Sequence, residues 1–323
     1  EIGLGIPAEP LFRSLRLTAF VAQRIGSDEI PVSAFVGIRF LMGFVVLLPL
    51  VIARERMRRR RIAQGDRTVE PVDHRQSVIG GMVCGVVLMA ASWLQQAAIP
   101  HVSVGKAGFL TALYIIMVPI LSFLFTRRSK AKVWVSAAIS AVGLYFLCMK
   151  PNESFGIGGW ELILIGGALM FSLQIMSIDH FVVRTDGVEL SCMQFLTTGA
   201  LGSVIALARG EMSLAGVSTA GILALLYAGI FSSGIAYTLQ IVGQKGADPA
   251  IASLIMSLES VISAVSAFLI LHQTMSGREL FGCVLMASAI VLVQMPELHP
   301  GRKRAEAGEN GETGKTKDGT QNA

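Results

Sequence analysis

The chain has 323 residues, of which 53% are apolar and only 15% are charged, and its mean hydropathy is +0.62. A soluble domain usually carries about 25% charged residues because water must wet its surface, so this composition excludes most soluble folds. The net charge of +5 is also found in nucleic-acid-binding proteins, but here the basic residues cluster in short segments between long apolar stretches. We therefore predict that lipid is the main solvent of this protein.

The first 24 residues differ from the rest of the chain. Charged residues interrupt every apolar window of this segment, namely Glu1, Glu9, Arg13, Arg16 and Arg24. The uncharged piece 17–23 is too short to cross about 30 Å of hydrocarbon, and for residues 1–17 we expect at most a short or interfacial helix. The chain also begins with Glu and not Met, which favours a truncated or misread gene start over a design with nine and a half helices.

Nine later stretches are long and apolar enough to be membrane spans. They lie at about 32–53, 77–99, 104–125, 133–149, 159–179, 188–208, 217–241, 248–271 and 278–295. These stretches lack the alternation of a membrane barrel, and only helices or closed barrels satisfy their own backbone in lipid. The predicted fold is an all-α membrane protein, a ten-helix bundle with nine clear spans and a degraded first span near 11–25.

The basic residues predict the orientation, because loops that stay in the cytoplasm carry an excess of Lys and Arg. The segment after 32–53 contains Arg54, Arg56, Arg58, Arg59, Arg60, Arg61, Arg67 and Arg75, the one after 104–125 contains Arg127, Arg128, Lys130 and Lys132, and the final tail opens with Arg302, Lys303 and Arg304. All three lie on one side if the spans alternate, which places both termini in the cytoplasm if the first span forms. We favour this topological role for 54–61 over a nucleic-acid or anionic-lipid patch.

A weak internal repeat accompanies this pattern. Shifting the chain by 145 residues aligns Leu94-Gln95 with Leu239-Gln240, Ala107 with Ala252, Leu113 with Leu258, and Phe123-Leu124 with Phe268-Leu269. The repeat unit is then five helices, and an odd unit inserted twice faces opposite ways, as in many transporters. We predict two inverted five-helix repeats, 1–150 with an atypical segment 1–17 and 151–296, followed by a disordered cytoplasmic tail, 297–323.

Nothing in the sequence indicates catalysis or a cofactor. The four cysteines are scattered singly, which suggests neither a disulfide framework nor a zinc site, and no phosphate-binding loop or catalytic motif occurs. The informative residues are therefore polar groups at membrane depth, which are costly there and face a partner or a wet cavity. They include Gln95, Gln96, Gln174, Gln194 and Gln240, which are typical of contacts between helices as well as of ligand sites.

Three charged residues within or beside the spans have both functional and structural interpretations. Glu259 lies midway along its span and either binds a substrate amine, couples transport to protons, or joins helices as a neutral or paired carboxyl group. For Arg39 and Lys106 we favour interfacial anchors or helix-end partners, with Arg39 near enough to the outer surface for partial snorkelling.

Four short stretches carry a resemblance to a known family. They are Ala19-Phe20-Val21-Ala22-Gln23-Arg24, Gly37-Ile38-Arg39-Phe40-Leu41, 107–114 (AGFLTALY) with Val118-Pro119, and Ser257-Leu258-Glu259-Ser260-Val261. In this order they resemble the drug/metabolite transporter superfamily, specifically its ten-helix permeases with two EamA domains. The resemblance covers residues 18 to 296.

The resemblance implies a function and a site. Such permeases move small polar metabolites or drugs, usually outward across a bacterial inner membrane, and their third, fourth, eighth and ninth spans line a central cavity. By position, these spans carry Trp93, Gln96, Tyr114, Tyr237, Gln240 and Glu259 as substrate-binding candidates, with Arg39, Lys106 and Pro119 as structural or gating residues. Two departures are Ser260, where the family commonly has Pro, and His272-Gln273, where it often has Gly-Glu.

The sequence thus favours a secondary transporter, an exporter that works by alternating access. Its expected partners are a small-molecule substrate and the lipid bilayer, with no nucleic acid, no metal and no cofactor. A non-transporting membrane sensor or assembly partner with the same fold is the alternative. A membrane-embedded enzyme is disfavoured because no cluster of metal ligands or nucleophiles occurs.

Overall fold

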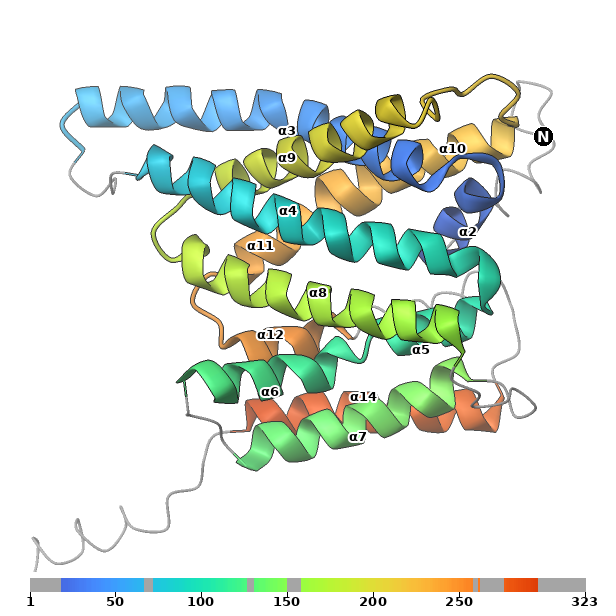
Figure 1. Ribbon diagram of the computed structural model, residues 1–323. Helices are drawn as coiled ribbons and strands as arrows, with labels where there is room; N and C mark the ends of the chain where they lie inside the picture. The colour runs from blue at the N-terminus through green and yellow to red at the C-terminus, as the bar shows by residue number, and fades with distance from the viewer. Residues whose placement is uncertain are drawn as a thin grey trace, which may run out of the picture. The chain divides into compact units, whose positions relative to one another are not determined.

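The computed structural model describes residues 19–66, 72–126, 131–149, 158–257, 261 and 276–295. Helices and turns make up the described chain, with no strand in those ranges (Figure 1). Eight of the described helical segments are long and apolar enough to cross a membrane, so the protein is an all-α, multi-span membrane protein. The atypical segment 1–17 and the predicted disordered tail 297–323 lie outside the described residues.

The helices follow eight of the nine predicted spans closely, whereas most of the predicted span 248–271 lies outside the described residues. In chain order they are α2 (Ala19–Glu29), α3 (Val32–Ala63), α4 (His74–Ala98), η1 (Ile99–His101), α5 (Val104–Thr111), α6 (Tyr114–Thr126), α7 (Ala131–Cys148), α8 (Gly159–Val182), α9 (Gly187–Ala208), α10 (Thr219–Tyr227), the π-helix η2 (Ala228–Tyr237), α11 (Thr238–Gln244), α12 (Pro249–Met256) and α14 (Gly277–Gln294). The prediction of at most a short or interfacial helix concerns residues 1–17, which lie outside the described residues, and α2 begins after them.

Several helices begin where a side chain accepts hydrogen bonds from the first free N–H groups. Asp73 accepts from Gln76 N at the start of α4, and Asp186 accepts from Val188 N at the start of α9. Ser103, Ser218 and Asp248 cap α5, α10 and α12 in the same way. These caps explain why the helix starts lie within a few residues of the predicted span starts.

The helix α3 is longer than its predicted span, which we placed at 32–53. It continues to Ala63 as one helix, because Glu55 forms ion pairs one turn further along with Arg58 at 2.6 Å and Arg59 at 2.7 Å. The helix ends just before Gly65, whose φ of 79° lies in the left-handed region. The arginine-rich segment is therefore helical, and not the loop that the sequence suggested.

Two spans are not regular α-helices throughout. The span predicted at 104–125 is interrupted at Ala112 and Leu113, directly before the turn in which Pro119 leaves the carbonyl of Ile115 without its usual N–H partner. The span predicted at 217–241 contains the π-helix η2. The π-helix is rare in proteins, and where π-helical turns occur, they are often at functional sites.

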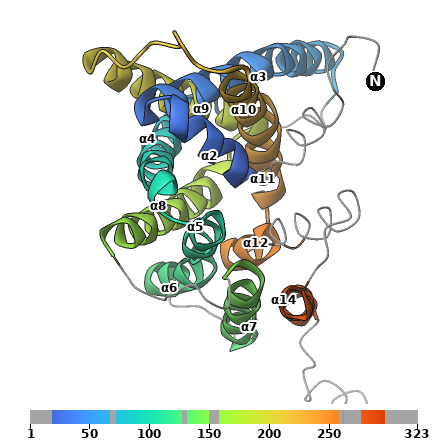
Figure 2. The ribbon, with the colours of Figure 1, turned by 90° about the vertical axis from the view of Figure 1, so that its right-hand side faces the viewer.

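Contacts join helices that are far apart in the sequence. Helix α3 packs along α9, α4 packs on α8 and α9, and α2 packs on α10, and Figure 2 shows α4 beside α8. The crossing of α3 and α9 is close enough that a Cβ atom on Gly37 would lie 2.6 Å from Ser203 N, and one on Gly202 would lie 2.8 Å from Gly37 Cα. Glycine is required here because the two backbones touch.

A second close crossing joins α7 and α14. A Cβ atom on Gly143 would lie 2.9 Å from the carbonyl oxygen of Gly282, and one on Gly282 would lie 2.6 Å from the carbonyl oxygen of Gly143. Each crossing is thus reciprocal, with glycine facing glycine from the two halves of the chain.

Candidate functional site

Arg39 is the most deeply buried charged residue of the described chain. Its side chain is 1% exposed, and its Cζ atom lies 4.6 Å from the centroid of the Phe40 ring and 5.8 Å from that of Phe35. The prediction that Arg39 snorkels to the surface is therefore wrong. The reason is that α3 packs against both α9 and η2, which cover it with protein, whereas the sequence of one helix reveals only depth.

The charge of Arg39 is only partly compensated. Within the described ranges its Nε atom has no hydrogen-bond partner, and no ion pair to it occurs there. The two phenylalanine rings supply a cation–π contact, but a buried charge at membrane depth still costs at least about 2.5 kcal/mol. A negatively charged or strongly polar group close to Arg39 would offset that cost.

Three aromatic rings from three helices meet beside Arg39. The centroids of Phe40 and Phe195 lie 5.8 Å apart, and Tyr237, the last residue of the π-helix η2, lies 6.0 Å from Phe40 and 6.5 Å from Phe195. The two tyrosine contacts are close to edge-on, the favourable geometry for aromatic pairs. The predicted site residue Tyr237 is therefore held by α3 and α9.

Trp93 and Tyr114 pack against the same apolar cluster as Tyr237. Trp93 Nε1 donates to Ser33 Oγ at 3.2 Å, and the Cζ atom of Arg209 lies 5.8 Å from the Trp93 ring centroid. Tyr114 also packs against a second cluster, formed largely by α5, α7 and α12. The structure thus brings three of the predicted substrate-binding residues to one side-chain cluster.

Gln96 and Gln240 have different surroundings. Gln96 is fully buried, and its Nε2 donates to the carbonyl oxygen of Gln23 at 3.0 Å and to Ser27 Oγ, so its amide nitrogen joins α4 to α2. Gln240 is half-buried on α11. Glu259, the sixth predicted substrate-binding residue, lies outside the described residues.

Lys106 and Pro119 lie in the two pieces of the interrupted span. Lys106 Nζ contacts Glu161 Oε1 at 2.5 Å, and the two side chains are 13% and 14% exposed. This ion pair joins the start of α5 to the start of α8. Pro119 lies within α6, where it removes one backbone hydrogen bond.

Two buried amides add to this region, although the sequence did not distinguish them from ordinary helix contacts. Gln174 on α8 and Gln194 on α9 are 0% exposed, and neither amide has a hydrogen-bond partner in the described part of the chain. Each lies within one turn of residues of two apolar clusters. Burying an amide without a hydrogen-bond partner costs a few kcal/mol. A polar ligand that binds to either amide would therefore be favoured.

A family model matches most of the chain. The match covers residues 18–149 and 158–295, and the family is described as the EamA-like transporter family. The chain belongs to the EamA-like transporter family. The two matched segments agree with the resemblance to two EamA domains that the motifs carry.

Several relatives of this EamA-like protein are named as transporters. A protein of Archaeoglobus fulgidus named "Uncharacterized transporter" is 26% identical, over 67% of this chain and 68% of its own length. The Escherichia coli K12 protein named "Uncharacterized inner membrane transporter YedA" is 23% identical over 86% of both chains. "Protein PecM" of Dickeya dadantii is 24% identical over 72% of this chain and 77% of its own length.

The fold of the EamA-like chain also occurs among solved structures. A crystal structure with a TM-score of 0.66 and 16% identity covers 90% of this chain and 97% of its own. That likeness concerns the fold alone. Family, relatives and apolar helices together show a membrane transporter.

Proposed function

We propose that this transporter exports small polar metabolites or drugs across a bacterial inner membrane as a secondary transporter, by alternating access. One observation carries the proposal: Arg39, Gln174 and Gln194 are buried polar side chains. Within the described ranges, the Nε atom of Arg39 and the side-chain amides of Gln174 and Gln194 have no hydrogen-bond partner. They come from α3, α8 and α9, helices of both halves of the chain. Such groups are retained at membrane depth when a substrate or a relay uses them.

Inverted repeats support alternating access. The predicted halves, 1–150 and 151–296, contain the two family segments 18–149 and 158–295. The helix contacts are those that a two-fold relation predicts: α3 crosses its counterpart α9, α7 crosses its counterpart α14, and α4 packs on α8 as α10 packs on α2. Two halves related in this way can exchange their roles as a central site opens to one side and then to the other.

The proposed substrate site combines aromatic and polar groups. Trp93, Tyr114 and Tyr237 offer apolar faces with polar tips, and Gln96 and Gln240 remain candidates for hydrogen bonds to the substrate. For Glu259 we propose the functional one of its two sequence interpretations, which is to bind a substrate amine or to carry a coupling proton, over a carboxyl group that joins helices. A substrate with both acidic and basic groups would suit Arg39 and Glu259 together.

Expression in a host exposed to toxic amino-acid analogues and cationic drugs tests this function. We expect the wild-type chain to increase tolerance to at least one compound, and Glu259→Gln and Arg39→Gln to remove that protection. Arg56→Gln is the matched control, because Arg56 lies on the same helix as Arg39 but is exposed, and it should protect like the wild type.

Membrane abundance of each variant separates loss of transport from loss of the protein, and Arg39→Lys retains the charge if Arg39→Gln does not accumulate. Tolerance that stays unchanged with every compound would favour a non-transporting sensor or assembly partner. Reconstituted vesicles that show no solute-driven flux, with or without a pH gradient, would refute the transport proposal.

A further inference from the structure

The C-terminal part of α3 extends beyond the hydrocarbon core. The helix has 32 residues, about 48 Å at 1.5 Å per residue, whereas the hydrocarbon of a bilayer is about 30 Å thick. Before Ala53 the helix is mostly apolar, with Arg39 as its one charged residue, and arginines predominate from Arg54 to Arg61. This last part of α3 therefore lies at the level of the lipid headgroups.

An open cavity of about 750 Å³ lies between this part of α3 and the first turns of α4 and α9. Four arginines of α3 line it, namely Arg54, Arg58, Arg60 and Arg61. The spacing of 54, 58 and 61 places three of them along one face of the helix. In Figure 1 the end of α3 lies beside the start of α4.

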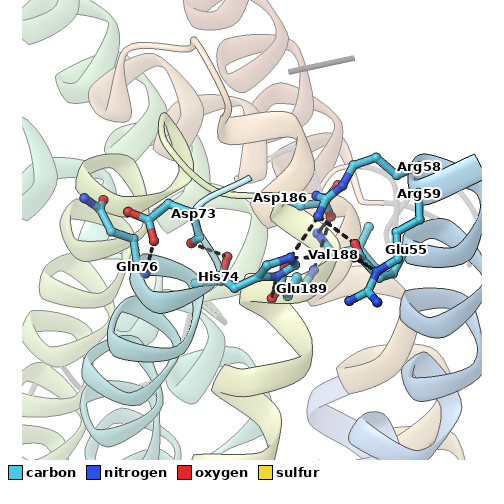
Figure 3. A network of polar contacts seen from close by, with 10 residues as sticks. Glu55, Arg58, Arg59, Asp73, His74, Gln76, Asp186, Val188 and Glu189 are labelled. Atoms are coloured by element: carbon cyan, nitrogen blue, oxygen red, sulfur yellow. Dashed lines mark hydrogen bonds and ion pairs between the residues drawn. The ribbon is translucent and has the colours of Figure 1, made fainter. Parts of the chain in front are cut away.

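Two of these arginines are held by carboxylates, and Figure 3 labels one of them, Arg58, beside Glu55. Arg54 Nη2 lies 3.1 Å from Asp186 Oδ2, and Asp186 is also the residue that caps α9. Arg58 Nη2 lies 2.6 Å from Glu55 Oε2. Both guanidinium groups are therefore fixed within the wall of the cavity, and both carboxylates are already occupied.

The third carboxylate of the cavity is that of Glu189, and His74 forms a hydrogen bond with it. Arg58 Nη2 lies 2.9 Å from His74 Nε2, and His74 Nδ1 lies 2.7 Å from Glu189 Oε1. A guanidinium group can only donate, so Nε2 accepts from Arg58, and Nδ1 carries the proton and donates to Glu189. This network assigns a neutral imidazole and leaves Glu189 bound to it.

Arg60 and Arg61 remain without an acidic partner. Their side chains form no hydrogen bond or ion pair with any residue of the ranges that the structure describes. Four arginines face three carboxylates, and with His74 neutral the lining has one net positive charge. The cavity is thus arranged for an additional anion.

The apolar surroundings indicate what kind of anion this is. Val51 and Met57 also line the cavity, and Ile52, Met57 and Ile62 are exposed apolar side chains on the same part of α3. Apolar groups beside arginines at headgroup depth suit an amphipathic ligand. A small soluble anion would gain nothing from them.

We propose that this cavity binds the phosphate group of an anionic phospholipid such as phosphatidylglycerol, through the guanidinium groups of Arg60 and Arg61. Guanidinium groups bind phosphate oxygens with paired, charge-assisted hydrogen bonds. The glycerol part of the lipid lies against Val51 and Met57. The ion pair of Arg54 with Asp186 holds α3 to α9, and the hydrogen bond of Arg58 with His74 holds α3 to α4, which keeps the site open.

The test is lipid binding by the full chain in detergent, measured by native mass spectrometry with phosphatidylglycerol or phosphatidylcholine added at equal concentration. We expect the wild type to prefer phosphatidylglycerol by about 30-fold, at about 1 kcal/mol for each arginine and 1.4 kcal/mol for a factor of ten. The double variant Arg60→Gln/Arg61→Gln should lose this preference. Arg56→Gln/Arg75→Gln removes the same charge at the same end of the protein, outside the cavity lining, and should keep it.

Three results would overturn the proposal. The first is a wild type without preference for phosphatidylglycerol, and the second is an equal loss of preference in both double variants, which would mean a general effect of surface charge. The third is displacement of phosphatidylglycerol by millimolar inorganic phosphate, which would make the ligand a soluble anion. Thermal unfolding in phosphatidylcholine confirms that each variant is folded before binding is compared.

Discussion

The two ends of the described helices treat their charges differently. At the end where α3 terminates, Arg60 and Arg61 have no carboxylate among the described residues, and a cavity of about 750 Å³ lies open beside them. At the opposite end Lys106 contacts Glu161, and Arg24 donates to the carbonyl oxygens of Ile99 and Val102, so these two cations are matched. Arg278 at the start of α14 differs, because its Nε and Nη2 atoms have no hydrogen-bond partner among the described residues and its guanidinium group lies over the rings of Tyr145 and Phe146.

The comparison indicates which end of the protein is closed by side-chain contacts between its helices. The matched end joins α2, η1, α5 and α8, and Glu29 of α2 also accepts from Ser218 at the start of α10. The arginine-rich end joins α3, α4 and α9 at the headgroup level but leaves room for a ligand. We expect the matched contacts to contribute more to stability, and the arginine-rich end to respond more to lipid.

The largest effect is expected at the Lys106–Glu161 pair. Both side chains are mostly buried, so Glu161→Gln removes the negative charge that contacts the Lys106 ammonium group and should lower the free energy of unfolding by about 2 kcal/mol. The thermal unfolding midpoint in detergent measures this loss. The exchange Lys106→Glu/Glu161→Lys should recover part of it, whereas no loss in Glu161→Gln would contradict the account of the matched end.

A smaller effect is expected for Glu189→Gln at the arginine-rich end. Glu189 accepts from the half-exposed imidazole of His74, and the loss of its charge weakens one hydrogen bond by about 1 kcal/mol. The same unfolding measurement checks this value. A larger loss than in Glu161→Gln would reverse the comparison between the two ends.

Asp186→Asn should have a smaller effect still. Asparagine preserves the cap of α9 and removes only the ion pair with Arg54, whose side chains are 48% and 25% exposed, so we expect about 0.5 kcal/mol. Asp186→Ala removes the cap as well and should cost about 1 kcal/mol more. Equal effects of the two variants would show that the cap does not contribute.

The smallest effect is a pH dependence at the matched end. Hydrogen bonds from the side chain and then the backbone of Ser218 lower the pKa of Glu29 below its ordinary value of 4.5. Because the folded pKa is lowered, the contribution of Glu29 is present above pH 4.5 and is lost as the pH falls through the folded value. Unfolding midpoints between pH 7 and pH 3 should fall less steeply in Glu29→Gln than in the wild type.

The sequence predicted the spans well because apolar length alone decides them. It missed the helical end of α3, since the run from Arg54 to Arg61 resembles a loop unless the pairs of Glu55 within the helix and of Arg54 with Asp186 are known. The partner of His74 is Glu189, 115 residues further along the chain. No spacing rule connects such residues.

The candidate site was predicted only in part, for the same reason. Trp93, Tyr114 and Tyr237 could be placed on spans that face one another, and the structure brings them to one cluster. The burial of Arg39 could not be predicted, because it depends on how α3 packs against α9 and η2, which lie in the other half of the chain. The depth of a residue in the membrane follows from the sequence, but whether its side of the helix is covered by protein follows from packing.

Solute flux in reconstituted vesicles tests the central claim most directly, namely that buried polar groups shared by both halves form a transport site. With a compound selected in the growth screen, we predict gradient-driven flux for the wild type and for Arg56→Gln, and at least a tenfold slower flux for Arg39→Gln, which is about 1.4 kcal/mol of lost binding or transition-state stabilisation. Equal flux in Arg39→Gln and the wild type, at equal protein content, would contradict the account.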